Sequence, residues 1–415
     1  MNISQGLSEP QPVPAAPSRP AGDFMACLEV LLLFLRLGCL SFGGPVAHLG
    51  YFRDEFVERR RWLSDADFAP LVALAQLLPG PASSQCGFAI GVSRAGLWGG
   101  FAAWIGFTLP SALLMLAFAL GRETTQGTIG QSILHGLQLV SVAIVAQAVV
   151  TMRRTLAPDL PRLLFATISA VVVLVAPPAF AASLAIACGA IGGYLFLPFR
   201  PPVAPAEARS IVTRKTGVVA GISFLTLLAL AFFMRDSRLS MLTLCATFFR
   251  VGAMVFGGGH VVLPLLSAAV VTRGWITPQA FLAGYGAAQA MPGPLFTFAA
   301  YLGATAGNTH RPLVHGVAAL VAIFLPGLLL MSAILPFWNR WRQSRALGAA
   351  LQGVNASVVG VLLAALYRPV WVDSVHTLSD VMIASLAFVA LTRGKTPPWV
   401  VVVGVGVVSA LVSRR

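Results

Sequence analysis

The sequence contains little charge. Asp, Glu, Lys and Arg make up 10% of its 415 residues, against about 25% in soluble globular domains. Hydrophobic residues make up 57%, and the mean hydropathy is +0.83. This composition excludes a soluble globular domain and predicts a chain in a lipid bilayer, where each spanning helix needs roughly 20 apolar residues. The net charge of +14 does not indicate nucleic-acid binding, because the basic residues are scattered over short loops and mark topology instead.

Groups that carry catalysis or hold metals are also scarce. The five cysteines stand alone, without CxxC or Cys/His spacing, and we interpret them as small buried hydrophobes. Asp and Glu form no cluster at metal-ligand spacing, and the sequence has no P-loop, GxSxG or HExxH motif. We therefore expect no metal, no cofactor, no enzymatic activity and no direct coupling to ATP.

What the sequence has instead is a series of apolar runs, typical of an all-α, polytopic membrane protein. Six runs, a lone run and six more predict about 13 transmembrane helices. The runs are 24–42, 69–91, 95–120, 134–152, 163–176, 179–198, 217–234, 239–257, 282–306, 313–336, 347–367, 377–392 and 397–412. Residues 1–23, rich in Pro, Ala and Ser, are expected to form a disordered tail. The rest divides into an N-terminal half (24–198), a linker with a connecting helix (199–238) and a C-terminal half (239–415).

The two halves repeat one pattern. R-L-G-C-L-S-F-G-G begins at Arg36, R-V-G-A-M-V-F-G-G begins at Arg250, and a Pro-Gly-Pro triplet follows each copy. Equivalent helices are seven spans apart, and an odd separation turns the second copy upside down in the membrane. Inverted-topology repeats are a hallmark of secondary transporters, whose substrate site lies near the midplane between the repeats. Lys and Arg are somewhat more numerous on the side that carries the N-terminus, which favours a cytoplasmic N-terminus.

Arg36 and Arg250 occupy equivalent positions inside apolar runs. A charge at the bilayer centre costs about 3 kcal/mol on insertion scales, so such a residue is paired, hydrated or functional. Snorkelling to the interface would explain one arginine, but not the same one in both copies beside the same glycine pair. Because a guanidinium binds tetrahedral oxyanions bidentately, we expect the two arginines to converge on a doubly negative oxyanion.

Breaks in the backbone follow each arginine. Glycine permits close backbone approach and proline removes a donor, and a broken helix at membrane depth is tolerated only where protein or a watery cavity satisfies it. Freed N–H groups at such breaks attract anions; a plain loop or a structural kink is the alternative interpretation. The candidate substrate-binding residues here, with the glutamine one turn before each triplet, are Phe42, Gly43, Gly44, Gln76, Pro79, Gly80, Pro81, Phe256, Gly257, Gly258, Gly259, Gln289, Pro292, Gly293 and Pro294.

Three residues are candidates for proton coupling. Glu29 lies seven residues before Arg36, on the same helix face, and could carry protons or serve as the counter-charge of that arginine. A carboxylate near the lipid headgroups is the simpler interpretation of Glu29. His48 and His260 stand beside the glycine breaks, at different register, and are possible proton relays.

The motifs around the breaks are specific. F-G-G-P-V-A-H-L-G-Y-F-R with L-P-G-P, and F-G-G-G-H-V-V-L-P with A-Q-A-M-P-G-P-L-F-T-F, closely resemble the two signatures of the chromate ion transporter family. The similarity covers about residues 24–412. It implies a long-chain, two-half member that exports chromate from the cytoplasm across the cell membrane, driven by the proton motive force, and confers chromate resistance. The sequence after the first triplet departs from the second copy, so contacts at Ser83, Ser84 and Gln85 cannot be transferred between halves.

Two other functions stay open at this point. Chromate and sulfate are near-isosteric dianions, so the chain could transport sulfate or another tetrahedral oxyanion instead. A membrane scaffold or sensor that transports nothing would leave the duplicated arginines and breaks unexplained. The sequence does not indicate an oligomeric state.

Overall fold

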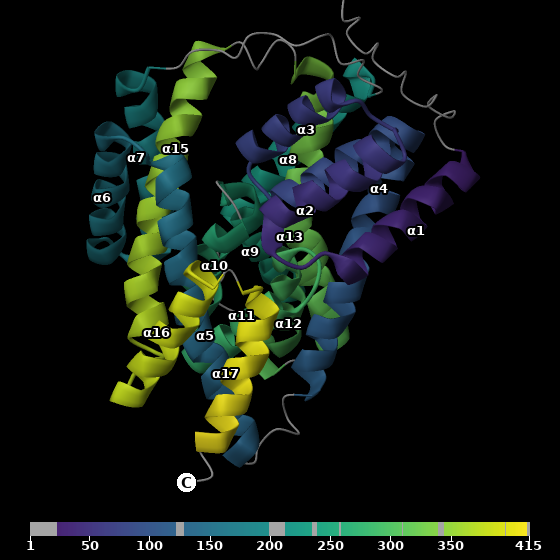
Figure 1. Cartoon of the computed structure of the whole chain (residues 1–415). Coiled ribbons are helices and arrows are strands. Elements are labelled where there is room, and N and C mark those ends of the chain that lie inside the picture. Colours follow the sequence, from purple (N-terminus) through teal and green to yellow (C-terminus); the bar gives the residue numbers. More distant parts are fainter. Residues whose placement is uncertain are drawn as a thin grey trace, which may run out of the picture.

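The computed structural model describes residues 23–121, 128–198, 212–234, 239–256, 259–308, 310–338, 344–394 and 396–412. This part of the chain consists of helices joined by short loops, without a strand (Figure 1), so the predicted all-α class is confirmed. The predicted tail, apart from Asp23, lies outside the described residues, as does 199–211 of the predicted linker.

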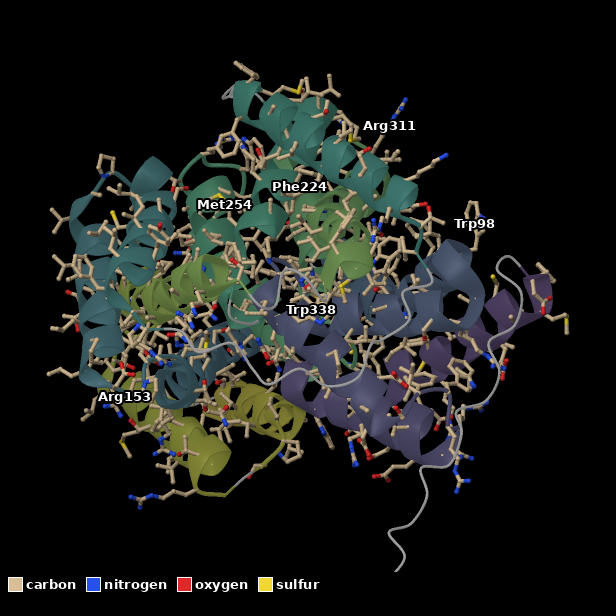
Figure 2. All side chains as sticks on the ribbon, turned by 90° about the horizontal axis from the view of Figure 1, so that it is seen from above. Trp98, Arg153, Phe224, Met254, Arg311 and Trp338 are labelled. Atoms are coloured by element: carbon tan, nitrogen blue, oxygen red, sulfur yellow. The ribbon has the colours of Figure 1, made fainter. Side chains whose placement is uncertain are left out.

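Five helices are long and apolar enough to cross a membrane, by length and composition. They cover 82–121, 130–156, 214–233, 312–337 and 345–371. The other apolar helices within the described ranges are shorter, so the predicted count of 13 spans is not confirmed. Large apolar side chains face outward: seen from above, Trp98 stands at the outer edge, 71% exposed, whereas Trp338 lies inside the bundle, 8% exposed (Figure 2). An apolar outer surface of this kind fits a multi-pass membrane protein.

The chain turns back on itself at the Phe-Gly-Gly break. The elements of this first hairpin are α1 (Phe24–Leu40), α2 (Gly44–Arg53) and the π-helical turn η1 (Asp54–Arg59). Phe34 of α1 contacts Phe52 and Phe56, with ring centroids 5.4 and 4.9 Å apart. All three rings are fully buried, so the returning segment packs along α1 in antiparallel orientation. The predicted span 24–42 is one arm of a helical hairpin.

A second hairpin is built in the same way after the connecting helix. Its elements are α9 (Met241–Met254), η3 (Gly259–Val261), α10 (Val262–Leu266) and η4 (Ser267–Val271). Past η4, which is a π-helical turn like η1, the Arg273 guanidinium donates a hydrogen bond to the Thr247 hydroxyl of α9 at 3.0 Å. The returning chain therefore runs back along α9.

Another kind of hairpin turns at each Pro-Gly-Pro triplet. The elements are α3 (Asp65–Leu77) and the start of α4 (Ala82–Gly121) in the first half, and α11 (Pro278–Ala290), η5 (Leu295–Thr297) and α12 (Phe298–Thr305) in the second. The Tyr301 hydroxyl donates to the Ala280 carbonyl at 2.9 Å, and the rings of Phe281 and Phe298 meet edge to face, so α11 and α12 run antiparallel. The prediction that the triplets interrupt helices is confirmed.

Glycines bring the next pair of arms into backbone contact. α4 bends sharply at Ala95 and Gly96, and beyond the bend its second arm runs back along the first. A Cβ on Gly91 would lie 2.3 Å from the Gly99 carbonyl oxygen. α13 (Pro312–Ile334) packs against α12 in the same manner, with Gly303 against the backbone of α13.

The long helices α5 and α15 pack on partners from the other half of the chain. The elements are α5 (Thr128–Leu156), α6 (Leu160–Val175), α7 (Pro178–Phe196), the connecting helix α8 (Arg214–Phe233), α15 (Arg345–Ala365) with its π-helical extension η8 (Leu366–Trp371), α16 (Leu378–Thr392) and α17 (Pro398–Val412). α15 packs against α6 and α7, and α5 packs against α16 and α17 (Figure 1). Gly353 of α15 touches the backbone of Gly189 and Gly193, as small residues allow between membrane helices.

Candidate functional site

The breaks of the two halves are hydrogen-bonded to each other. The Gly293 N–H donates to the Ser41 carbonyl oxygen at 2.8 Å, and the Gly80 N–H donates to the Val255 carbonyl oxygen at 2.7 Å. Ser41 and Val255 are the residues that directly follow α1 and α9. Each Pro-Gly-Pro triplet is therefore bonded to the broken helix of the opposite half, in a reciprocal arrangement.

Glycine is required at the centre of each triplet. The φ angles of Gly80 and Gly293 are +123° and +92°, a region that L side chains rarely adopt. A Cβ would lie 3.0 Å from the Gly327 Cα in the first case and 2.9 Å from Ser111 Oγ in the second. The flanking prolines have no N–H, so the glycine supplies the one backbone donor of each triplet.

The breaks after α1 and α9 also lie against each other. A Cβ on Gly259 would be 3.6 Å from the Pro45 ring. Gly43 and Gly44 both have positive φ, +104° and +78°, which turns the chain from α1 into α2. The first N–H groups of α2 have no partner within the helix. The structure thus brings all four predicted breaks together.

The two phenylalanines that begin the glycine breaks have different surroundings. Phe42 packs on Trp399 at the start of α17, with 5.9 Å between ring centroids. Phe256 is half-buried. Gly257 and Gly258 lie outside the described residues, so their predicted role stays a prediction.

The glutamines near the triplets do not behave alike. Gln76 is exposed, and Gln289 is half-buried beside Tyr285. Reasoning from the sequence missed Gln85, whose amide donates to the Pro79 carbonyl at 2.9 Å and to the Gly327 carbonyl at 3.2 Å. Gln85 therefore ties the first triplet to α13. The available signal was an amide inside an apolar helix, because a buried amide must find partners.

Unpaired polar atoms gather around the meeting point of the breaks. Among the buried side-chain atoms that have no hydrogen-bond partner in the described part of the chain are those of Ser41, His48 and Gln85, which adjoin the breaks, together with Ser84, next to Gln85, and Thr108, next to Phe107, whose carbonyl faces Gly293. A buried polar atom left unpaired costs about 1–3 kcal/mol. Water or a polar solute is what satisfies such groups in protein interiors, so this region suits a hydrated or solute-filled site.

The arginines lie one step back from the breaks. Arg36 lies five residues before Ser41, and Arg250 lies five residues before Val255. Each separation corresponds to about 7.5 Å along a helix axis. Arg36 is exposed on α1 and forms no hydrogen bond or ion pair with the residues described. Arg250 is half-buried, and its guanidinium donates to Thr247 at 3.2 Å, one turn towards the start of α9. That the two converge on one solute stays a prediction.

Glu29 pairs with arginines other than the one predicted. Its carboxylate accepts from Arg60 at 3.5 Å and from Arg94 at 3.2 Å, and Arg60 also donates to Glu55 at 2.6 Å. The interpretation of Glu29 as the counter-charge of Arg36 is therefore wrong. Arg60 follows the first hairpin and Arg94 lies on the first arm of α4, so the tertiary fold brings both guanidiniums to Glu29. The spacing of residues along α1 does not reveal such contacts.

Replacing Glu29 by glutamine is expected to destabilise the fold. Arg60 and Arg94 would lose the carboxylate they share, at a cost of about 1–3 kcal/mol for partly buried pairs. Thermal unfolding of the purified variant should begin several degrees lower. Asp65→Asn is the control, because Asp65 pairs with Arg53 in an exposed position. Equal unfolding midpoints for both variants would contradict this role of Glu29.

The two candidate histidines, His48 and His260, differ in the hydrogen bonds of their ring nitrogens. His48 is 1% exposed, and its Nε2–H donates at 3.2 Å to the Ser41 carbonyl, the oxygen that also accepts from Gly293. Nδ1 of that tautomer is an acceptor, and it has no partner within the described ranges. His260 Nδ1 is bonded to the Tyr285 hydroxyl at 2.9 Å. His48 therefore has a buried ring nitrogen that can accept a proton.

Two relatives match the sequence over nearly its full length. It is 28% identical over 392 residues to the chromate transport protein of Cupriavidus metallidurans, covering 93% of this chain and 92% of the relative. It is 29% identical over 401 residues to the chromate transport protein of Pseudomonas aeruginosa, covering 94% and 93%. The uncharacterized transporter YwrA of Bacillus subtilis matches over 159 residues at 28% identity, covering 36% of this chain and 85% of the relative. No solved structure matches.

One family is matched on both sides of the connecting helix. The family described as chromate transporter matches residues 28–194 and again residues 242–410. The first match takes in the hairpins from α1 to α4 and the helices α5 to α7, and the second takes in α9 to α17. The chain belongs to the chromate transporter family.

Proposed function

We propose that this protein exports chromate from the cytoplasm across the cell membrane, driven by the proton motive force, and so confers chromate resistance. Membership of the chromate transporter family and relatives named chromate transport proteins support the substrate. The observation that carries the proposal is the meeting of four helix breaks linked by the Gly293–Ser41 and Gly80–Val255 hydrogen bonds. Secondary transporters bind ions at interrupted helices of this kind.

The proposed chromate site uses backbone donors together with the arginines. Opening the Gly293–Ser41 or the Gly80–Val255 hydrogen bond would free a backbone N–H for the dianion, at a place where buried polar atoms lack partners. We propose that the halves have inverted topology with a cytoplasmic N-terminus, so that the two bonds open towards opposite faces of the membrane. Arg36 and Arg250 would supply charge from the helix arms that lead to the site.

The membrane potential favours the proposed direction. An elementary charge that crosses 100 mV changes its free energy by about 2.3 kcal/mol, so the free energy of a dianion falls by about 4.6 kcal/mol when it leaves a negative interior. Protons that enter can add to this drive. Glu29, His48 and His260 are the candidate proton carriers. His48 is bonded to the helix break through its Nε2 and the Ser41 carbonyl, and its Nδ1 has no partner among the described residues, which supports a role for that residue.

Chromate uptake into everted membrane vesicles tests the proposal. Energised vesicles that contain the protein should accumulate chromate, and an uncoupler should reduce uptake about tenfold, to the level of vesicles without the protein. Valinomycin with potassium collapses the potential alone, and nigericin collapses the proton gradient alone, so the pair separates the two components. Uptake that withstands the uncoupler would refute the energy source, and uptake confined to right-side-out vesicles would refute the direction.

Sulfate serves as the competing solute in the same vesicles. Excess sulfate should inhibit chromate uptake in part, because the two dianions have the same shape. A saturable sulfate flux larger than the chromate flux would favour the alternative, a transporter of sulfate or another tetrahedral oxyanion.

A further inference from the structure

In the second half, the first arm of the triplet hairpin, α11, is docked on a long helix of the other half. α11 lies along α5, where the Gln138 amide donates to the Gln279 carbonyl at 3.1 Å. The Ser141 hydroxyl donates to the Leu282 carbonyl, also at 3.1 Å. The backbones touch as well, because a Cβ on Gly286 would lie 2.3 Å from a carbonyl oxygen of α5. α11 is therefore docked on α5 through one face of its helix.

The equivalent arm in the first half, α3, is not docked in this way. Within the described ranges, α3 packs on α4 and α2 and has no contact of comparable extent with α15. Figure 1 shows α3 and α15 standing apart. The α3 residues that correspond to the docked face of α11, 213 positions earlier in the sequence, are Ala66, Ala69 and Ala73. All three are exposed, lie on one helix face and are followed on that face by Gln76, which is exposed too.

The helix α15 has the amide that such docking requires. Asn355 stands 217 positions after Gln138, at the equivalent place in the repeat. It is half-buried and forms no hydrogen bond with the residues described. α15 packs on η3 and α10 instead, so α5 and α15 both hold hairpins of the second half. None of the first-half arms α1, α2 and α3 packs on either helix to a comparable extent in the described part of the chain.

We propose that this structure is one of two states, and that in the other state α3 docks on α15 while α11 leaves α5. The inference rests on the proposed function and its inverted halves, because each of two inverted repeats can adopt the conformation of the other. In the second state the Asn355 amide donates to the Ala66 carbonyl, as Gln138 donates to Gln279 here. α11 leads directly into the second triplet, so its release moves Gly293 away from Ser41.

The exchange alternates between the two ends of the molecule. α3 begins close to the place where Arg60 meets Glu29, near the start of α1, which is the proposed cytoplasmic end. α11 lies towards the opposite end (Figure 1). Because α11 is docked and α3 is not, this is the conformation that receives the solute from the cytoplasm.

The state with α11 docked is the more stable of the two. Docking of α3 places Ala73 where α11 has Gly286, and its Cβ keeps the two backbones further apart. It also places Val358, which has no donor, where α5 has Ser141. The loss of one hydrogen bond between the helices favours the α11-docked state roughly two- to tenfold.

Crosslinking of matched cysteine pairs in the full-length protein tests the exchange, after replacement of its five native cysteines by alanine. Gln138→Cys with Gln279→Cys reports docked α11. Asn355→Cys with Ala66→Cys reports docked α3. A short bismaleimide should link the first pair at once and the second pair several-fold more slowly, because it traps a rarer state. The control pair, Ala66→Cys with Leu363→Cys, should not link, since Leu363 lies about 12 Å beyond Asn355 along α15.

The two links should exclude each other. A chain with all four cysteines should acquire one link or the other, never both, as the mass of the intact protein shows. Chromate flux in vesicles should fall in proportion to the fraction of either pair that is linked. Absence of the α3–α15 link, or both links in one chain, with chromate flux intact in the unmodified protein, would overturn this inference alone. Absence of flux in the unmodified protein would overturn the proposed function, whereas links that exclude each other would still support the exchange.

Discussion

The Gly293→Ala variant is expected to reach the membrane but to transport chromate at least tenfold more slowly. A φ of +92° costs an alanine about 1–3 kcal/mol, and the added Cβ would press on Ser111 Oγ at 2.9 Å. Relieving either strain moves the N–H that donates to Ser41. Gly80→Ala should have the same effect through the reciprocal bond, because Gly80 has a φ of +123°.

Vesicle flux, divided by the amount of protein in the membrane, measures the Gly293→Ala effect. Gly50→Ala is the control, because Gly50 lies on α2 with nothing within 4 Å of an added Cβ. That variant should transport normally, since alanine is favoured over glycine within a helix. Normal flux in both Gly80→Ala and Gly293→Ala would show that the reciprocal hydrogen bonds are not needed for transport.

Arg36→Ala and Arg250→Ala are each expected to abolish chromate resistance without removing the protein from the membrane. Hydrogen bonds to a charged group contribute about 1.5–3 kcal/mol each, so the loss of even one of them weakens dianion binding roughly ten- to hundredfold. Growth on chromate and immunoblots of membrane fractions are the measurements. Arg153→Ala, which removes an exposed arginine elsewhere, should keep full resistance.

The two arginine variants also show whether one half or both halves recognise the charge of the solute. Arg36 is exposed, and Arg250 is half-buried beside Thr247. Loss of resistance in Arg250→Ala alone would confine charge recognition to the second half. Normal resistance in both variants would refute the assignment of these arginines to the solute.

The helix breaks and the helical class could be predicted from the sequence. Gly-Gly and Pro-Gly-Pro carry their own backbone preferences, so residues such as Gly80 and Gly293 reveal an interruption without any knowledge of their neighbours. Long apolar runs likewise exclude a soluble fold. These signals are local, so they can be read from a single sequence.

What could not be predicted depends on contacts between distant segments. Hydropathy shows that 24–42 is apolar but not that the chain then reverses, which the packing of Phe34 on Phe52 makes visible. The side chain of Glu29 turns to Arg60 and Arg94 because other elements fold against α1. The role of Gln85 depends on α13, which follows more than 200 residues later in the sequence.

Each long helix packs on helices from the other half of the chain, and this limits the order in which the tertiary contacts can form. α6 and α7 are synthesised well before α15, whose backbone α7 touches at Gly189 and Gly193 and α6 touches at Ala166. Contacts between distant segments form late and slow folding. Until α15 is synthesised, these surfaces of α6 and α7 lack the helix that they contact in the folded protein, so we expect a chain truncated before α15 to leave them facing lipid.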